Sequence, residues 1–483
     1  MKVMKLTHVA NAATLLATVV AAALLPMQPA AAQSTRPTGR TQHWTVRPEW
    51  VRAHEAFLAS DAMRGRGSAT HDEEVAATYV ASEFMAYGLK PAPGMTGFIQ
   101  RAPVVRPELT GAATLSVGDV TLHEGSDFDI LLSAGAPVSG TFRNESDGQG
   151  NATTPLAGEI VLARAGNGDA LSAVRPLLQR GASVVLVPES GSVDTLAIQM
   201  GGKPRVTAHL ASAPAAGSGP TIVIVHPAAV QRLAHVTAGT RATLDVHTLA
   251  NPAPQETYNA IGYLEGTDPS SGTILLSAHL DHLGVGRPIA GDSIYNGAND
   301  DAAGTTAVME LAHALAAGPR PRRNILFVCY GSEEIGELGS TYFGEHPPVP
   351  LSSLVANLEF EMIGNQDPKT AKGMLLFTGW GRSNLGATLR AHGALLGPDP
   401  YPDQHFFERS DNYALALQGV VAHTAAGWGT PPTYHQVDDD LAHLDIGFMT
   451  SAIQSLIEPV RWLATSDFTP TWNPGGRPAR NAH

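Results

Sequence analysis

The spacing of apolar and polar residues changes several times along the chain, and the first change lies near the N-terminus. Lys2 and Lys5 precede an uncharged run from Ala10 to Leu25, which is followed by a stretch of small residues that ends at Ala32. A basic start, a short apolar run and small residues are typical of a signal peptide, so we assign residues 1–32 to one. The apolar run is short for a membrane span of about 20 residues, so an uncleaved anchor is the weaker alternative. We expect cleavage near Ala32 and a periplasmic or secreted protein that leaves the membrane.

Helical periodicity begins after a polar segment. Residues 33–46 lack periodicity and are predicted to be a mobile lead-in. A first helix is expected over Trp50–Ser60, and a second begins at the capping box Thr70–Glu73 and ends at Gly88. The second helix carries one apolar face, formed by Ala76, Val80, Phe84 and Tyr87. Residues 47–108 are thereby assigned to the first part of the main domain.

Short β-like runs dominate residues 109–247. Ile160–Leu162, Val184–Val187 and Ile222–Val225 are separated by Gly, Ser, Pro and Asn, with one amphipathic helix at about Leu171–Arg180. No His, Asp and Glu residues gather here at ligand spacing. The pattern predicts an inserted, mainly β domain without chemistry of its own.

Apolar strands alternate with helices over residues 248–468, and residues 469–483 form a tail. The predicted strands are Ile274–Ala278, Ile325–Tyr330, Leu354–Phe360, Met374–Thr378 and Val420–Val421. The predicted helices include Ala302–Ala317, Ser383–Leu396 and Ile446–Ala464. Alternation of this kind predicts an α/β fold, with a mixed, mostly parallel sheet sandwiched by helices. Such sheets place their sites at the carboxyl ends of the strands.

Chain length, net charge and cysteine content limit the number of domains, the partners and the disulfides that the protein can have. A chain of 483 residues is long enough for a large domain and a smaller one. The net charge of −13 argues against nucleic acid as a partner. Cys329 is the only cysteine, so an internal disulfide is excluded, and its apolar neighbours indicate a small buried core residue.

Two imidazoles and a carboxylate follow the first strand of the main domain directly. In an extended strand, His279 and Asp281 point to the same side, so Asp281 can accept a hydrogen bond from the imidazole and orient it. A lone His-x-Asp is a weak signal for a metal site.

Asp300 and Asp301 stand at the start of a predicted helix. Taken alone, this pair is better interpreted as a helix cap, because Asp and Asn stabilise exposed amide groups there by about 0.5 to 2 kcal/mol.

Glu333 and Glu334 follow a strongly apolar strand, where two adjacent carboxylates are costly without a cation. One could bind a metal while the other takes a proton from water. An exposed acidic turn is an equally good interpretation of this pair.

Glu361 ends another apolar strand, and His435 lies in a later polar loop. Together with the preceding motifs they supply five candidate ligands and a base at successive strand ends. Two zinc sites that share one carboxylate need such a set, and cobalt or manganese could occupy the same ligands.

The order of these motifs resembles metallopeptidase family twenty-eight, which includes co-catalytic di-zinc aminopeptidases and is related to glutamate carboxypeptidase II and the transferrin receptor. The resemblance extends to Phe57–Asp61 and Gly65–Gly67. It implies that residues 248–468 form a catalytic zinc peptidase domain with the zinc-aminopeptidase fold. The inserted segment, residues 109–247, resembles a protease-associated domain.

The resemblance also implies a role for each candidate residue. His279 and Glu361 would bind one zinc, Glu334 and His435 the other, and Asp300 would bridge the two. Glu333 would be the general base for the water between the metals, and Asp281 would orient His279. These roles rest on the matching motifs.

Three positions bear on how far the resemblance extends. The position of Glu361 holds aspartate in many members of the family, and glutamate is one methylene longer. Asn412 stands where histidine often follows Ser-Asp. Asp301 is often Asn or Asp in such sequences, and we interpret it as part of the loop structure and not as a ligand.

The leading functional hypothesis is an aminopeptidase acting on peptides, because no Arg/Lys patch lies near the motifs to bind a substrate carboxylate. A carboxypeptidase or dipeptidase on the same centre is the first alternative. Glutaminyl cyclase chemistry and a non-catalytic, receptor-like binding protein are the others. Side-chain specificity and oligomeric state stay open.

Overall fold

The computed structural model describes residues 44–145, 154–164, 170–199, 205–213, 219–249 and 255–479. The predicted signal peptide, residues 1–32, and residues 33–43 of the predicted lead-in lie outside the described residues. Val46, near the end of that lead-in, is buried, and its amide donates to Gln454 Oε1 at 2.8 Å. No helix within the described ranges is long and apolar enough to cross a membrane.

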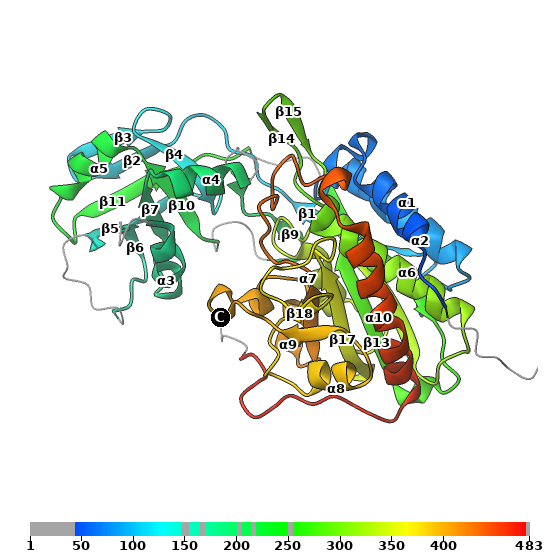
Figure 1. The fold of residues 1–483 in the computed structure, drawn as a ribbon. Coiled ribbons are helices and arrows are strands. Elements are labelled where there is room, and N and C mark those ends of the chain that lie inside the picture. The colour runs from blue at the N-terminus through cyan, green and yellow to red at the C-terminus, as the bar shows by residue number, and fades with distance from the viewer. Residues whose placement is uncertain are drawn as a thin grey trace, which may run out of the picture. The chain divides into compact units, whose positions relative to one another are not determined.

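The main domain is built on a nine-stranded mixed sheet with the order β19-β18-β20-β17-β13-β16-β12-β1-β9 (Figure 1). Its strands are β1 (Ile99–Val105), β9 (His209–Leu210), β12 (Gln255–Leu264), β13 (Thr273–His279), β16 (Asn324–Tyr330), β17 (Leu354–Glu361), β18 (Leu375–Phe377), β19 (Leu396–Pro398) and β20 (Ala422–Ala426). Strands β16, β13, β17 and β20 pair in parallel at the centre, and β18 pairs with β19 in parallel. Strands β12, β1 and β9 extend one side in antiparallel fashion, and β18 pairs antiparallel with β20. The sheet confirms the predicted α/β fold class.

Helices cover the main sheet because the central strands are apolar on both faces. The helices are α1 (Pro48–Leu58), α2 (His71–Ala86), α6 (Ala303–Ala317), α7 (Leu338–Glu345), α8 (Leu385–Ala391), α9 (Asn412–Gln418) and α10 (Ile446–Thr465). Ile274 and Phe327 pack in one core cluster with residues of α2, α6 and α10. Figure 1 shows these helices on the same side of the sheet, where α6 contacts both α2 and α10. Leu275 and Leu326 pack in another cluster with residues of α7 and α9. Cys329 is fully buried in the first cluster, which confirms its interpretation as a core residue.

The capping box at the start of α2 is only half formed. Thr70 caps the helix as predicted and accepts a hydrogen bond from the amide of Asp72. Glu73 reaches back to the amide of Ala69, one residue before Thr70, and not to that of Thr70 itself. Its buried carboxylate also accepts hydrogen bonds from Tyr258 N and Thr257 Oγ1 of β12 and from Ser332 Oγ.

Two predicted boundaries near the C-terminal end are displaced. Helix α8 ends at Ala391 and not near Leu396, because Gly393 turns the chain with a φ of +103° and Leu396 begins β19. The last strand begins at Ala422, two residues beyond Val420.

The segment predicted as an inserted domain contains a second nine-stranded sheet, with the order β3-β2-β11-β5-β6-β7-β10-β4-β8. Its strands are β2 (Thr114–Val117), β3 (Val120–His123), β4 (Phe128–Ser133), β5 (Val138–Asn144), β6 (Glu159–Leu162), β7 (Val184–Pro188), β8 (Arg205–Val206), β10 (Thr221–Val225) and β11 (Arg241–Asp245). Its helices are α3 (Val174–Gln179), α4 (Gly191–Gln199) and α5 (Pro227–Ala234). Strand β9 comes from the same segment but pairs with β1 of the main sheet.

A buried arginine joins the N-terminal region to two loops of the main domain. Arg66 donates hydrogen bonds to the carbonyl oxygens of Leu58, Leu280, Asn296 and Gly297 at 2.7 to 2.8 Å. Leu280 follows β13, whereas Asn296 and Gly297 follow the short strand β15 (Asp292–Tyr295), the partner of β14 (Gly284–Ile289). Since each carbonyl is remote from water, Arg66 supplies the donors that these loops need.

Replacement of Arg66 by methionine is expected to lower the free energy of unfolding by about 3–5 kcal/mol, because four buried carbonyl groups lose their charged donor. Chemical denaturation of the purified variant measures this loss. Arg64→Met is the control, since the Arg64 side chain is 60% exposed and should change stability by about 0.5 kcal/mol or less. A loss below about 1 kcal/mol at Arg66 would contradict this role.

A second buried charge lies in α1. Glu55 is fully buried and accepts a hydrogen bond from Thr306 Oγ1 of α6 at 2.8 Å. Burial raises the pKa of Glu55 to about 8, although the Thr306 hydrogen bond and the charge of Arg66 act in the opposite direction. The folded protein therefore holds a proton on Glu55 that the unfolded chain releases near its ordinary pKa of 4.5.

Between these two pKa values, the unfolded state binds fewer protons, so Glu55 lowers stability as pH rises, by about 1.4 kcal/mol per pH unit. Glu55→Gln cannot ionise and is expected to remove this slope between pH 4.5 and about 8. Denaturation curves across that range test it, with the exposed Glu49→Gln of the same helix as control. Parallel pH profiles for wild type and Glu55→Gln would exclude the effect.

Candidate metal centre

The parallel strands bring the predicted residues to one edge of the main sheet. His279 is the last residue of β13, Glu333 and Glu334 come shortly after β16, and Glu361 is the last residue of β17. Parallel strands end at the same edge, so these side chains converge. Asp300 joins them from the turn Ala298–Ala302 before α6, and His435 from the loop after β20.

One group of donor atoms comes from His279, Asp300 and Glu361. Each offers one nitrogen or oxygen atom, and these atoms all lie within 4.8 Å of one another. His279 Nε2 lies 3.2 Å from Asp300 Oδ1. All three residues were predicted ligands, and they could hold one metal ion.

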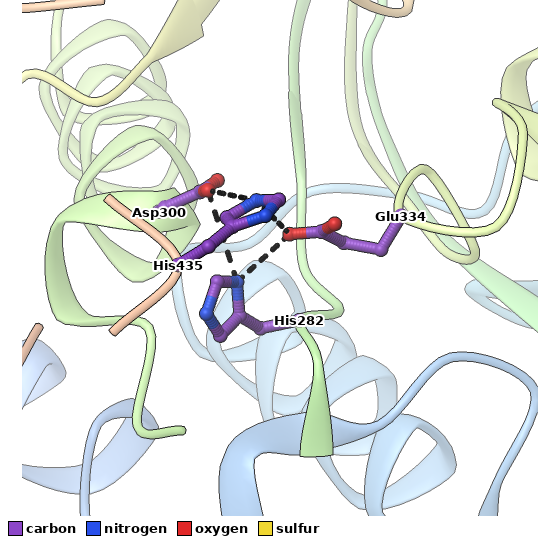
Figure 2. A group of neighbouring side chains, drawn as sticks. All are labelled: His282, Asp300, Glu334 and His435. Atoms are coloured by element: carbon purple, nitrogen blue, oxygen red, sulfur yellow. Dashed lines mark ion pairs between the residues drawn. The ribbon is translucent and has the colours of Figure 1, made fainter. Parts of the chain in front are cut away.

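A second group contains His282, Asp300, Glu334 and His435, whose side chains point toward one another in Figure 2. His435 Nε2 lies 3.0 Å from Asp300 Oδ2 and 3.1 Å from Glu334 Oε1. His282 Nδ1 lies 2.9 Å from the same Glu334 oxygen. Sequence reasoning assigned no role to His282, although its position beside His279-x-Asp281 was a usable signal.

Asp300 belongs to both groups and offers a different oxygen to each. Oδ1 faces His279, and Oδ2 faces His435. Burial and the charge of Glu334 act to raise the pKa of Asp300, but the contacts with His279 and His435 outweigh them and hold it below the ordinary value. Asp300 is thus an ionised carboxylate with one oxygen near the His279 imidazole and the other near the His435 imidazole. A ligand that bridges two metal ions would be placed in this way.

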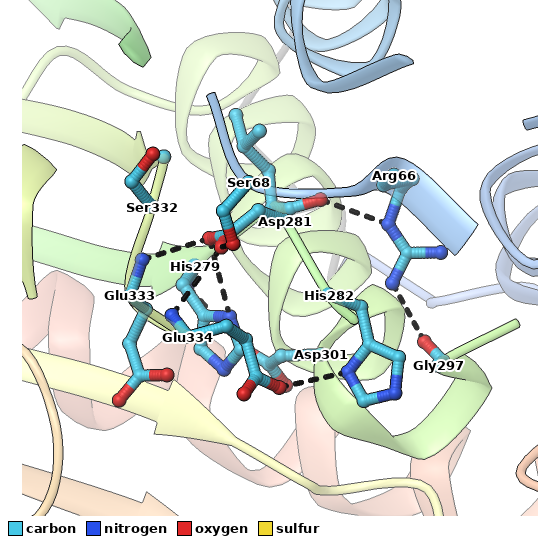
Figure 3. A network of polar contacts seen from close by, with 12 residues as sticks. Arg66, Ser68, His279, Asp281, His282, Gly297, Asp301, Ser332, Glu333 and Glu334 are labelled. Carbon is cyan, nitrogen blue, oxygen red and sulfur yellow. Dashed lines mark hydrogen bonds and ion pairs between the residues drawn. The ribbon is translucent and has the colours of Figure 1, made fainter. Parts of the chain in front are cut away.

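Asp281 contacts both the histidine and the glutamate turn (Figure 3). Its Oδ1 lies 3.7 Å from His279 Nδ1 and accepts a hydrogen bond from the Glu333 amide at 3.0 Å. Its Oδ2 accepts hydrogen bonds from Ser68 Oγ at 2.6 Å and from the Glu334 amide at 3.3 Å. Asp281, which was predicted to orient His279, therefore also holds the backbone of Glu333 and Glu334.

Glu333 belongs to neither donor group and lines a pocket beside them. Burial raises the pKa of Glu333 well above its ordinary value, against the attraction of His279, and the charges of Glu334 and Asp411 add to the rise. A carboxyl group in this setting has a high affinity for a proton, which is the property required of a general base.

Asp301 and Asp439 bind backbone amides around Asp300. Asp301 Oδ1 accepts hydrogen bonds from Gly304 N and Met362 N, both at 2.9 Å. Asp301 therefore stabilises the loop and the start of the helix, as its interpretation as a loop residue predicted. Its neighbour Asp300 instead faces the donor groups. Asp439 accepts from the amides of Asn299 and Asp300, both at 3.0 Å. Sequence reasoning missed Asp439, because nothing distinguishes it within the run Asp438–Asp440.

The pocket combines carboxylates, apolar side chains and one arginine. It is lined by Asp300, Glu333, Glu361, Met362, Leu376, Thr378, Phe406, Arg409, Thr424, Ala426, Gly429, Tyr434 and His435. Arg409 was not expected there, and its guanidinium carbon lies 5.1 Å from the centre of the Phe406 ring. Asn412 lies outside this lining and accepts a hydrogen bond from Thr424 Oγ1.

The donor set fits zinc. Both ring nitrogens of His279 and of His282 are buried and form no hydrogen bond within the described residues. Such groups are costly to bury unless another partner satisfies them, and a metal ion can be that partner. Imidazole and carboxylate ligands without a thiolate suit zinc.

Comparison with known sequences gives matches to part of the chain. Leupeptin-inactivating enzyme 1 of Streptomyces exfoliatus is 34% identical over 113 residues, which cover 23% of this chain and 24% of that protein. Aminopeptidase YwaD of Bacillus subtilis is 28% identical over 156 residues, covering 31% of this chain and 33% of the relative. The chain thus spans a quarter to a third of the length of these relatives.

Comparison with solved structures gives a match over most of the chain. The structure of a zinc aminopeptidase from Bacillus subtilis aligns with a TM-score of 0.55 and 19% identity, over 87% of this chain and 96% of that one. At this identity the match establishes the fold. The model described as Peptidase family M28 matches residues 259–458, which include both donor groups and Glu333. Over residues 259–458, the chain is therefore similar to peptidase family M28.

Proposed function

We propose that this protein is an exported, zinc-dependent aminopeptidase that binds two zinc ions and hydrolyses the N-terminal peptide bond of peptides. The observation that carries the proposal is the sharing of Asp300 between two donor groups, with Glu333 in the adjoining pocket and outside both groups. Hydrolysis of an amide needs an activated water, a proton acceptor and stabilisation of the developing oxyanion.

The residues would divide these tasks. His279, Asp300 and Glu361 would hold one zinc, and Asp300, Glu334 and His435 the other. When bound, the zinc ions supply the Lewis acid that polarises the substrate carbonyl and lowers the pKa of water. Glu333 would take the proton of the attacking water and pass it to the leaving amine, while Asp281 keeps His279 in place.

Two observations bear on which end of the peptide is recognised. The relative YwaD is named an aminopeptidase, which favours recognition of the N-terminus. Arg409 lines the same pocket and could pair with a carboxylate, which favours a carboxypeptidase or dipeptidase as the second candidate. Arg409 is a single side chain and the relative is named an aminopeptidase, so the aminopeptidase stays the leading proposal.

The remaining parts of the proposal rest on the sequence. The predicted signal peptide, residues 1–32, supports export to the periplasm or the medium. Residues 109–247 are proposed to be a protease-associated domain. Cobalt or manganese would fit the same oxygen and nitrogen ligands. Ligand-type residues at all five predicted positions favour an enzyme over a receptor-like binding protein.

Purified mature protein is expected to contain about two zinc ions per chain, as the two donor groups imply, and to cleave aminoacyl substrates with free N-termini. Elemental analysis and hydrolysis assays before and after chelation test both statements, because metal removal should abolish activity. Arg409→Gln should leave cleavage of amino-acyl amides nearly unchanged if the enzyme is an aminopeptidase. Activity on N-blocked peptides that depends on Arg409 would instead support the carboxypeptidase.

The two adjacent glutamates should respond differently to the same substitution. Glu333→Gln is expected to lower kcat by at least about 100-fold with the zinc content unchanged, because only the proton acceptor is removed. Glu334→Gln should reduce the zinc content as well. Activity assays with elemental analysis separate the two, and the exposed Glu345→Gln is the matched control. Equal zinc loss in both variants would refute Glu333 as a base.

A further inference from the structure

We propose that His282 is a metal ligand of the group formed with Asp300, Glu334 and His435, which makes the two metal sites unequal. This inference rests on the proposed metal-dependent function and adds a ligand to it. One site would have three protein ligands, His279, Asp300 and Glu361, whereas the other would have four. The four-ligand site would then hold its zinc more tightly.

The separations of the donor atoms match one metal ion. Ligand atoms about 2.0–2.1 Å from a tetrahedral zinc lie about 3.3 Å from one another. His282 Nδ1 lies 2.9 Å from Glu334 Oε1 and 3.9 Å from Asp300 Oδ2. His435 Nε2 lies 3.0 and 3.1 Å from the same two oxygens. The two imidazoles therefore approach the same pair of carboxylate oxygens, as two ligands of one ion would.

A hydrogen bond does not explain the position of His282. Despite the short distance to Glu334, neither ring nitrogen of His282 forms a hydrogen bond of acceptable geometry within the described residues. The residue is 0% exposed, so bulk solvent does not reach these nitrogens. A buried nitrogen without a partner costs about 1–3 kcal/mol, and coordination removes that cost at Nδ1.

The loop around His282 fixes the direction of its ring. The His282 amide donates to the carbonyl of Arg66 at 3.1 Å, and the Arg66 side chain binds the neighbouring carbonyls of Leu280 and Gly297. A Cβ atom on Gly297 would lie 2.5 Å from His282 Cγ, and Gly297 has a φ of +62°. Only glycine leaves room for the ring here. The imidazole is thus pre-positioned as a ligand (Figures 2 and 3).

Unequal ligand sets imply a division of labour between the sites. Closed zinc sites have four protein ligands, whereas zinc sites that bind substrate keep a position open. The group of His279, Asp300 and Glu361 has three ligands, and the other group has four. Both groups reach the pocket, through Glu361 in the first, His435 in the second and the shared Asp300. The number of ligands therefore leaves the open position for the substrate at the three-ligand site.

X-ray absorption spectroscopy on wild-type protein tests this assignment without a substitution. Metal-free protein given one equivalent of zinc should show two imidazoles on the bound ion, His282 and His435. At saturation, three imidazoles should be shared by two ions. One imidazole per zinc throughout would overturn the proposal, because it would leave His282 uncoordinated.

Substitution of His282 supplies a second readout. His282→Asn should lower the imidazole count on the first zinc to one and weaken its binding at least about 10-fold in a competition titration with a chelator. His423→Asn is the control, since His423 is equally buried but bonds to Ser383 and Thr378, away from both groups. Unchanged first-zinc affinity in His282→Asn would also overturn the proposal.

The number of bound zinc ions and the number of coordinated imidazoles test the di-zinc centre and the role of His282 separately. Two bound zinc ions with only two coordinated imidazoles would reject His282 as a ligand and leave the di-zinc centre intact. A single bound zinc carrying two imidazoles would support His282 and reject the di-zinc centre.

Discussion

The cost of burying charge at one edge of the main sheet is the constraint on which the structure of the site depends. Asp300, Glu333, Glu334 and Glu361 lie there with three imidazoles in little solvent. Burial raises the pKa of Glu333 and of Glu361, whose charges also repel their neighbours. Carboxylates that are crowded in this way need compensating positive charge if they are to stay ionised together. In the proposed centre, two divalent cations would supply this charge.

The loops that carry these ligands are held by polar side chains, because loops beside a buried site cannot rely on water for their backbone groups. Arg66 satisfies carbonyl oxygens, whereas Asp281, Asp301 and Asp439 satisfy amides. The loops also take left-handed turns, at Ser332 beside the glutamates and at His435 itself. The apolar strands set where the site lies, and the buried polar contacts set where each donor atom points.

Much of the site could be predicted because its residues follow apolar strands in the sequence. His279, Glu334 and Glu361 each stand at or just after such a strand, so one rule about strand ends finds all three. His282 stands beside His279-x-Asp281, which makes it a candidate, but the direction of its ring depends on Arg66 and Gly297, and the sequence does not show those contacts. Asp439 escaped detection because nothing distinguishes it from Asp438 and Asp440 in the sequence.

Local patterns were incomplete where other contacts or a single residue changed them. The capping box predicted that Glu73 binds the amide of Thr70, but the carboxylate binds the amide of Ala69, one residue earlier, together with buried donors of β12 and Ser332. At the end of α8, helical periodicity continued past Gly393, whose left-handed backbone ends the helix. In each case, a single residue decided a boundary or contact that periodicity alone could not determine.

Adjacent residues of like chemistry have different contacts in this site. Asp300 turns to the donor groups, while Asp301 turns back to the amides of Gly304 and Met362. Glu334 joins a donor group, while Glu333 is left to line the pocket. In the proposed centre, each pair of adjacent acids therefore provides one metal ligand and one residue with a separate task.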